Sequence, residues 1–166
     1  IALTTYVLTR EARGSLWDTG EFIASAKGLQ LPHPPGAPLF VLLGRFFIIL
    51  FGDESVAAGS AVNFMSALAS AATILFLFWS ITHFGRKLYA VKEDQLTQSQ
   101  VTTIMGAGIV GALAYTFSDS FWFSAVEGEV YALSSFFTAL VFWAMLKWEQ
   151  ADEKAGNNPA ERLRAD

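Results

Sequence analysis

The sequence predicts an all-α membrane protein, folded as a polytopic bundle of transmembrane helices, and three observations point to it. Hydrophobic residues make up 53% of the 166 residues and charged residues only 16%, whereas soluble domains carry about a quarter charged residues. The mean hydropathy is +0.40. Residues 61–82 contain no charged side chain and are long enough, at about 1.5 Å per helical residue, to cross a hydrocarbon core.

Two further segments are predicted to cross the membrane. Residues 101–117 and 130–147 are apolar and of about spanning length. The second segment ends at Lys147 and Trp148, a pair typical of the interface between lipid and water. Residues 1–9 are apolar but too short to cross, so we expect them to be the end of a transmembrane helix.

One apolar segment is predicted to lie differently. Residues 38–51 are too few to cross, and Arg45 stands in their middle. We therefore expect an interfacial or re-entrant helix, contained in an outward loop of residues 10–60.

The distribution of basic residues orients this bundle. Lys and Arg are enriched in cytoplasmic loops. They follow the predicted span at residues 61–82, and they occur again in residues 148–166. The hairpin of residues 118–129 contains neither. We therefore assign residues 148–166 to a cytoplasmic tail and the hairpin to the outward face. The first loop contains basic residues of its own, and it is assigned to the outward face because residues 38–51 are too short to cross.

Charge and composition exclude several function classes. The 15 acidic and 11 basic residues give a net charge of -4, which argues against a nucleic-acid partner because such binders present a basic face. The chain contains no cysteine, so disulfides, thiolate zinc sites and thiol nucleophiles are excluded.

The first outward loop carries two carboxylates three residues apart, Asp18 and Glu21. On a helix they share a face and could form one site. The same spacing also predicts a capping box, in which Asp18 caps the helix and Glu21 reaches back to its amide. The spacing alone favours the cap, although a capping carboxylate stays ionised and both interpretations can hold.

Two potential cations follow in the same loop. His33 lies in a proline-rich segment that could either hold the imidazole near the membrane surface or simply form a rigid turn. Arg45 could bind a lipid or ligand phosphate through its guanidinium, or extend to the headgroups without a specific partner.

The second outward loop is acidic and aromatic. Its charged residues are Asp119, Glu127 and Glu129. They could hold a divalent cation through oxygen ligands or orient a hydroxyl acceptor, and Asp119 and Glu129 could equally be solvated helix caps.

The order of motifs resembles a known family. The stretches W-D-T-G-E-F-I, H-P-P-G-A-P-L and F-S-D-S-F-W-F-S-A-V-E-G-E-V-Y-A-L-S-S are similar to those of GT-C membrane glycosyltransferases, most of all the bacterial protein-O-mannosyltransferase-like family. The resemblance covers nearly the whole chain. Family enzymes are several times longer, so this chain corresponds to their N-terminal part. The resemblance implies that this part is a helical bundle whose first outward loop carries the catalytic carboxylate.

The resemblance implies a reaction and roles for individual residues. The family is expected to transfer a sugar, here mannose, from a polyprenyl-phosphate donor to Ser or Thr hydroxyls of exported proteins, with inversion at the anomeric carbon. Asp18 matches the general base. The other carboxylates would orient either Asp18 or the sugar and acceptor hydroxyls: Glu21, Asp119, Glu127 and Glu129. The candidates for contact with donor or acceptor are His33, Arg45, Asp119, Glu127 and Glu129.

The resemblance also implies where the protein works and with what. The expected location is the bacterial inner membrane, with the active loops facing the periplasm or exterior. No metal ligand is assigned, although some GT-C enzymes use a divalent cation and the question stays open. The alternative is a transport or assembly subunit without covalent chemistry, but transporters place charges near the bilayer midplane, whereas these spans are nearly free of charge.

Overall fold

The structure is a computed structural model that describes residues 1–15, 17–52, 54–89 and 96–156. Every regular element in these ranges is an α-helix, as predicted. The helices are α1 (Ala2–Thr9), α2 (Thr19–Gly28), α3 (Pro38–Phe51), α4 (Ser55–Leu88), α5 (Gln98–Thr116), α6 (Asp119–Val126) and α7 (Val130–Gly156).

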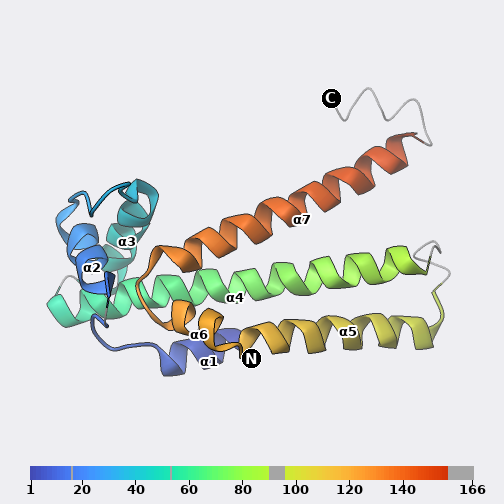
Figure 1. Cartoon of the computed structure of the whole chain (residues 1–166), viewed down its shortest axis with the longest axis horizontal. Helices are drawn as coiled ribbons and strands as arrows, with labels where there is room; N and C mark the ends of the chain where they lie inside the picture. The colour runs from blue at the N-terminus through green and yellow to red at the C-terminus, as the bar shows by residue number, and fades with distance from the viewer. Residues whose placement is uncertain (16, 53, 90–95, 157–166) are drawn as a thin grey trace.

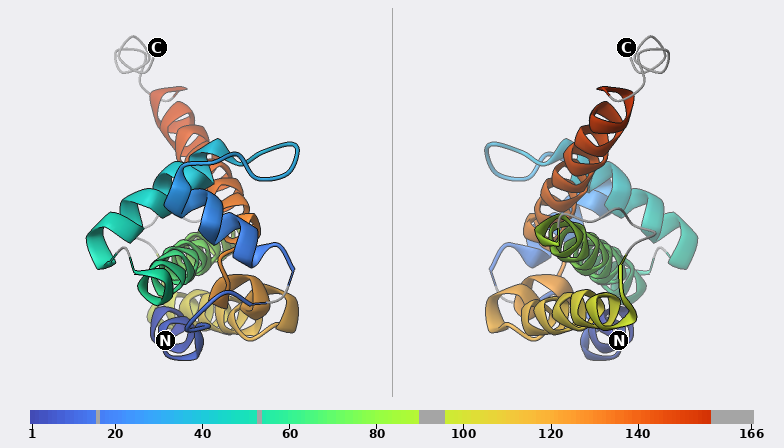
Figure 2. Two further views of the ribbon diagram at one scale, coloured as in Figure 1. Left: turned by 90° about the vertical axis from the view of Figure 1, so that its left-hand side faces the viewer. Right: turned by 90° about the vertical axis from the view of Figure 1, so that its right-hand side faces the viewer.

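Helix α4 is the axis around which the other helices pack. Figure 1 shows α5 running antiparallel beside it, while α7 starts against it and diverges toward the C-terminus. Helices α2 and α3 lie across the N-terminal end of α4, and α1 and α6 lie below it (Figures 1 and 2). The loops that carry the candidate site residues therefore meet at one end of the bundle.

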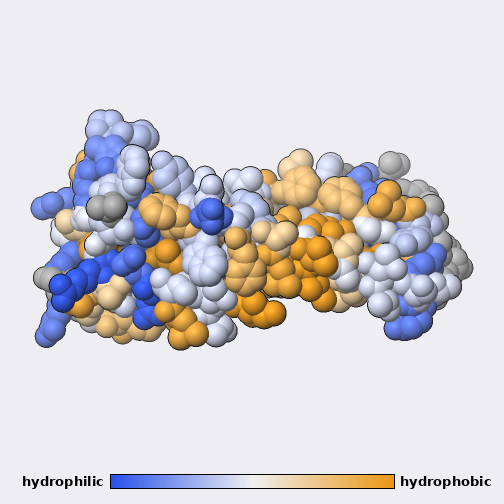
Figure 3. All heavy atoms as spheres, turned by 60° about the horizontal axis from the view of Figure 1, so that its bottom comes forward, coloured by the Kyte–Doolittle hydropathy of each residue, from blue (hydrophilic) through white to orange (hydrophobic). Residues whose placement is uncertain are grey.

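Two helices are long and apolar enough to cross a membrane, Val56–Leu88 and Val130–Glu153. Helices α5 and α6 reach that standard only when they are taken together, and they are bent by 68° at the break between them. Most of the predicted span at residues 101–117 is therefore helical. It meets the length and hydropathy expected of a membrane span only when α6 is counted with it. Figure 3 shows a hydrophobic belt between two more hydrophilic ends, as expected for a protein whose long axis crosses the bilayer.

The helix bounds differ most from the predicted ones at the start of α4 and the end of α7. Helix α4 begins at Ser55, inside the predicted outward loop, because residues 55–60 contain no proline and continue the helical hydrogen bonds. Helix α7 continues to Gly156, into the predicted tail, because the residues after Trp148 are good helix formers. Residues 157–166 of that tail lie outside the described part.

Helix α3 has the properties predicted for an interfacial or re-entrant helix. Its 14 residues span about 21 Å at 1.5 Å per residue, less than a hydrocarbon core of about 30 Å. One face is buried against α2 and α4, through Phe40, Gly44 and Ile48. The opposite face is apolar and exposed, at Leu42, Phe46 and Ile49 among others, which suits contact with lipid.

Helices α2 and α3 approach each other closely at Gly44. A Cβ atom placed on this glycine would lie 2.9 Å from the Cβ of Ala26, which is fully buried on α2. Carbon atoms in contact lie about 3.5–4.0 Å apart, so only glycine lets α2 sit this close to α3.

We expect Gly44→Ala to lower the free energy of unfolding by roughly 1–3 kcal/mol, because the added methyl group forces α2 away from α3. Gly106→Ala is the matched control: nothing lies within 4 Å of the added Cβ, and alanine favours the helix by about 0.5–1 kcal/mol. Denaturant unfolding of the full protein in detergent micelles measures both. Equal changes in the two variants would contradict this packing.

Candidate active site

The candidate site is built on the first turn of α2. Asp18 precedes the helix and Glu21 lies in its first turn, so both project from one end of it. The helix is held by its buried face, where Phe22 packs against Phe40 with ring centroids 5.3 Å apart. This apolar contact fixes the direction in which the carboxylates point.

The predicted capping box does not form. Asp18 does occupy the N-cap position of α2, but its side chain makes no capping hydrogen bond and its backbone is helical, with φ -85° and ψ -1°. A capping residue needs an extended backbone to aim its side chain at the amides of the first turn. The Asp18 carboxylate is instead 56% exposed, and Glu21 turns to another partner.

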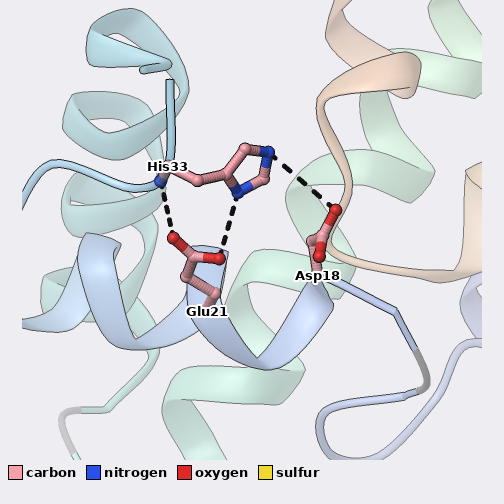
Figure 4. Close-up of side chains that lie close together, drawn as sticks. All are labelled: Asp18, Glu21 and His33. Atoms are coloured by element: carbon pink, nitrogen blue, oxygen red, sulfur yellow. Dashed lines mark hydrogen bonds and ion pairs between the residues drawn. The ribbon is translucent and has the colours of Figure 1, made fainter. Parts of the chain in front are cut away.

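Glu21 holds His33 through two hydrogen bonds. The backbone N–H of His33 donates to Glu21 Oε1 at 2.6 Å, and the ring Nδ1 lies 3.0 Å from Glu21 Oε2 (Figure 4). The turn after His33 is closed by the amide of Gly36, which donates to the His33 carbonyl at 2.9 Å and has φ +75°. One carboxylate thus anchors the proline-rich segment to α2.

This contact shifts the pKa values of both partners. The hydrogen bonds from His33 hold the pKa of Glu21 below its ordinary 4.5. The same contact raises the pKa of His33 above its ordinary 6.5, and the nearby charge of Asp18 acts in the same direction. The protonated imidazole and the ionised carboxylate therefore coexist between these two shifted pKa values.

The free nitrogen of His33 faces Asp18. His33 Nε2 lies 4.0 Å from Asp18 Oδ2, so the imidazole stands between the two carboxylates (Figure 4). One ligand atom from each of Asp18, Glu21 and His33 lies within 4.8 Å of the others, so this trio could also hold a metal ion. All three side chains are exposed to solvent.

Two buried carboxylates lie behind this trio. Glu127 and Glu129, in the segment between α6 and α7, are only 3% and 6% exposed. Ser15 donates to Glu127 Oε1 at 2.6 Å, and Thr19 donates to Glu129 Oε1 at 3.1 Å. Burial raises the pKa of Glu129 above its ordinary value. These carboxylates tie the start of α2 to α6 and α7 and present little surface to a ligand.

The two other predicted site residues lie elsewhere. Arg45 donates from Nη1 to the carbonyl of Lys27 at 3.1 Å, near the C-terminus of α2. At about 1.5 Å per helical residue, this is roughly 13 Å along the helix from Asp18. Asp119 is exposed at the N-terminus of α6 and makes no side-chain hydrogen bond or ion pair to a residue that the structure describes. The predicted substrate contacts of both residues stay predictions.

The sequence interpretation missed three residues of this site. Ser15 and Thr19 were not singled out because a hydroxyl near an acidic residue gives no signal before the fold is known. Trp17 is 83% exposed beside Asp18 and has φ +62°, a backbone conformation that costs about 1–3 kcal/mol for a bulky residue. Such strain gathers at functional sites, and the large exposed ring next to the acid is the signal that could have found it.

Comparison with known proteins gives a consistent family assignment. Residues 18–164 match the family model described as the protein O-mannosyl-transferase TMEM260 N-terminal domain. The mouse protein named protein O-mannosyl-transferase TMEM260 is 31% identical over 150 residues, which cover 90% of this chain. Its namesake from Dictyostelium discoideum is 24% identical over 138 residues, or 83% of the chain. The resemblance found in the motifs is thus confirmed.

The aligned region is a small part of these relatives. It covers 18% of the mouse protein and 15% of the Dictyostelium protein. No solved structure matches the chain significantly.

We expect Glu21→Gln to return the pKa of His33 toward 6.5, because a neutral amide no longer stabilises the imidazolium. The raised pKa of His33 also makes the free energy of unfolding of the native protein depend on pH. The contribution of His33 to that free energy is fully present below pH 6.5 and is lost as the pH rises through the raised pKa. The Glu21 contribution is lost as the pH falls through its lowered value. An NMR titration of ¹³C-labelled histidine measures the shift, and Asp119→Asn, which removes a carboxylate outside the trio, should leave it unchanged.

Proposed function

The chain belongs to the protein O-mannosyl-transferase TMEM260 N-terminal domain family, and on that premise we propose that it forms the part of a membrane O-mannosyl-transferase that carries the catalytic base. The proposed reaction moves mannose from a polyprenyl-phosphate donor to Ser or Thr hydroxyls of exported proteins. The observation that carries the proposal is the exposed, uncapped carboxylate of Asp18, fixed beside His33 at the polar end of the bundle.

Asp18 is proposed as the general base. An alcohol is a weak nucleophile at neutral pH, so a carboxylate must take its proton as the oxygen attacks the anomeric carbon. The bond from that carbon to the phosphate oxygen breaks as the new bond forms, and the phosphate leaves with the electron pair. Direct attack opposite the leaving group inverts the anomeric centre. An N-cap side chain bonded to the helix would be less available for this role, and Asp18 is free of such a bond.

His33 and Glu21 are proposed to support this carboxylate. The raised pKa of His33 favours the imidazolium, which places a positive charge 4.0 Å from Asp18. A fixed cation beside the reacting atoms can stabilise the charge that develops on the departing phosphate. Glu21 is a positioning residue in this scheme, because both of its oxygens bond to His33.

Glu127 and Glu129 are proposed to act through α2. Their buried oxygens accept from Ser15 and Thr19, which flank Asp18 in the sequence. Their proposed role is therefore to hold Asp18 in place, one of the two roles that the family resemblance left open for them.

The membrane arrangement supports the proposed access to substrates. The exposed apolar face of α3 brings the site to the lipid surface, where a polyprenyl-linked sugar lies. Arg86 and Lys87 lie in the last turn of α4, and the hairpin of residues 118–129 at the site's end contains no Lys or Arg, so the site is proposed to face away from the cytoplasm. A bacterial inner membrane rests on the motif resemblance alone, because the mouse and Dictyostelium relatives are eukaryotic.

We expect Asp18→Asn to reduce mannose transfer at least about 100-fold while the protein still folds, because the amide cannot accept the proton and no capping bond is lost. The assay uses membranes that contain the full protein, a labelled polyprenyl-phosphate mannose and exported protein as acceptor. Asp119→Asn is the control, since it removes a carboxylate outside the trio.

Equal transfer by Asp18→Asn and wild type would remove Asp18 from the chemistry. No transfer by wild type with any polyprenyl-phosphate sugar would favour the rival function, a transport or assembly subunit. Wild-type melting temperatures for both variants in micelles separate loss of chemistry from loss of fold.

We also expect that a chelator leaves transfer unchanged. A metal held by both Glu21 Oε2 and His33 Nδ1 would displace the hydrogen bond between these two atoms, and an imidazolium repels a cation. Transfer is measured with and without EDTA and after addition of Mg²⁺ or Mn²⁺. Activity that EDTA abolishes and a divalent ion restores would show that the trio, or another site in the full protein, does hold a metal.

A further inference from the structure

A second polar site lies at the opposite end of the bundle. A pocket of about 160 Å³ opens there between α4 and α7. It is lined by Trp79, Thr82, His83, Arg86, Trp143, Lys147 and Gln150. None of these residues belongs to the candidate active site, so the inference does not depend on the proposed function.

The sequence spacing places these side chains on two facing helix surfaces. The α4 residues follow at intervals of three, one and three positions, and the α7 residues at intervals of four and three. Both patterns mark a single face of a helix. The rings of Trp79 and Trp143, 5.2 Å apart, join the two faces and form an apolar wall of the pocket.

The pocket combines cations with a buried imidazole. Lys147 lies over the Trp143 ring at 6.0 Å and bonds to the neutral amide of Gln150 at 2.9 Å. Arg86 contributes a second cation to the lining. His83 is only 8% exposed, and its Nε2 has no hydrogen-bond partner among the residues that the structure describes. A buried polar nitrogen without a partner costs stability, so a ligand that bonds to it is favoured.

Two acidic side chains of the described part of α7 lie near this pocket and are engaged by another cation. Glu149 and Glu153 both pair with Lys87, at 2.8 and 3.3 Å. The bond that Lys147 makes in the structure is to an uncharged group. The pocket therefore offers positive charge and hydrogen-bond donors to an anion.

We infer that this pocket binds the phosphate of an anionic phospholipid. The chemistry fits a phosphate, because ammonium, guanidinium and imidazole all donate to phosphate oxygens. The position favours a lipid over a soluble anion. The pocket lies between two candidate membrane-spanning helices, at the end where Lys147 and Trp148 mark the lipid interface. Basic pockets between such helices are suited to acidic headgroups.

The test measures lipid binding to the full protein in neutral detergent by native mass spectrometry, with short-chain phosphatidylglycerol and phosphatidylcholine as probes. The solution contains roughly 1 M salt, so that a screening length of about 3 Å suppresses diffuse surface attraction. We expect phosphatidylglycerol to bind and phosphatidylcholine to bind far more weakly. Lys147→Gln should weaken phosphatidylglycerol binding about tenfold, the loss of one charge-assisted contact.

Two variants make the test specific. Gln98→Glu lowers the charge of the same end of the bundle by one unit, as Lys147→Gln does, but at an exposed position outside the pocket, and it should change binding by less than about twofold at this salt. His83→Phe keeps the net charge and removes the buried nitrogen, so it should also weaken binding. Lys147 is exposed, so its variant is expected to fold even if the His83 variant does not.

Each outcome bears on the inference. Selective binding that falls with Lys147→Gln and not with Gln98→Glu supports it. Equal losses in both variants would mean general surface attraction and would overturn it. Inorganic phosphate that displaces the lipid at millimolar concentration would also overturn it, in favour of a soluble phosphate ligand in the same pocket.

Discussion

The placement of the candidate active site depends on two buried carboxylates. Glu127 and Glu129 are almost fully removed from water, and an ionised or polar group in such a position must find hydrogen-bond donors. Ser15 and Thr19 supply them, at the price of fixing the residues on both sides of Asp18 against the junction of α6 and α7. Without this link, the start of α2 would lose its hydrogen bonds to the segment between α6 and α7, and its position would depend on the contact of Phe22 with Phe40 and on the bonds between Glu21 and His33.

A second polar link completes the site from the other side. Glu21 bonds to both the backbone and the ring of His33, so the proline-rich segment is attached to α2 at two points. Asp18 is left exposed between these two links, unbonded to its own helix. A rigid frame around one free carboxylate is the arrangement that general-base catalysis requires, because the acceptor hydroxyl must find the base already in position.

The sequence predicted the helices better than it predicted what the polar side chains do. Long charge-free stretches leave few alternatives to a membrane helix, so α4 and α7 could be located. The spacing of Asp18 and Glu21 correctly placed them at one helix end, but spacing cannot choose between a cap and a distant partner. A capping box does form between Thr97 and Gln100, whereas Glu21 bonds to His33, which lies 12 residues away in the sequence. Glu129 is buried, and Arg45 bonds to the carbonyl of Lys27, because of contacts between segments that are distant in the sequence. A local sequence pattern carries no information about such contacts.

The length of α4 has a consequence for where the two proposed substrates would meet. Its 34 residues extend for about 51 Å, whereas the hydrocarbon core of a bilayer is about 30 Å thick. Even a tilted α4 must therefore project well beyond the hydrocarbon, and α2 and α3 lie across its projecting N-terminal end (Figure 1). Under the proposed function, a projection of this kind would set Asp18 near the depth of the lipid headgroups. A sugar on a membrane-bound carrier would reach that depth from the lipid and a polypeptide acceptor from the water, so neither would have to leave its own phase.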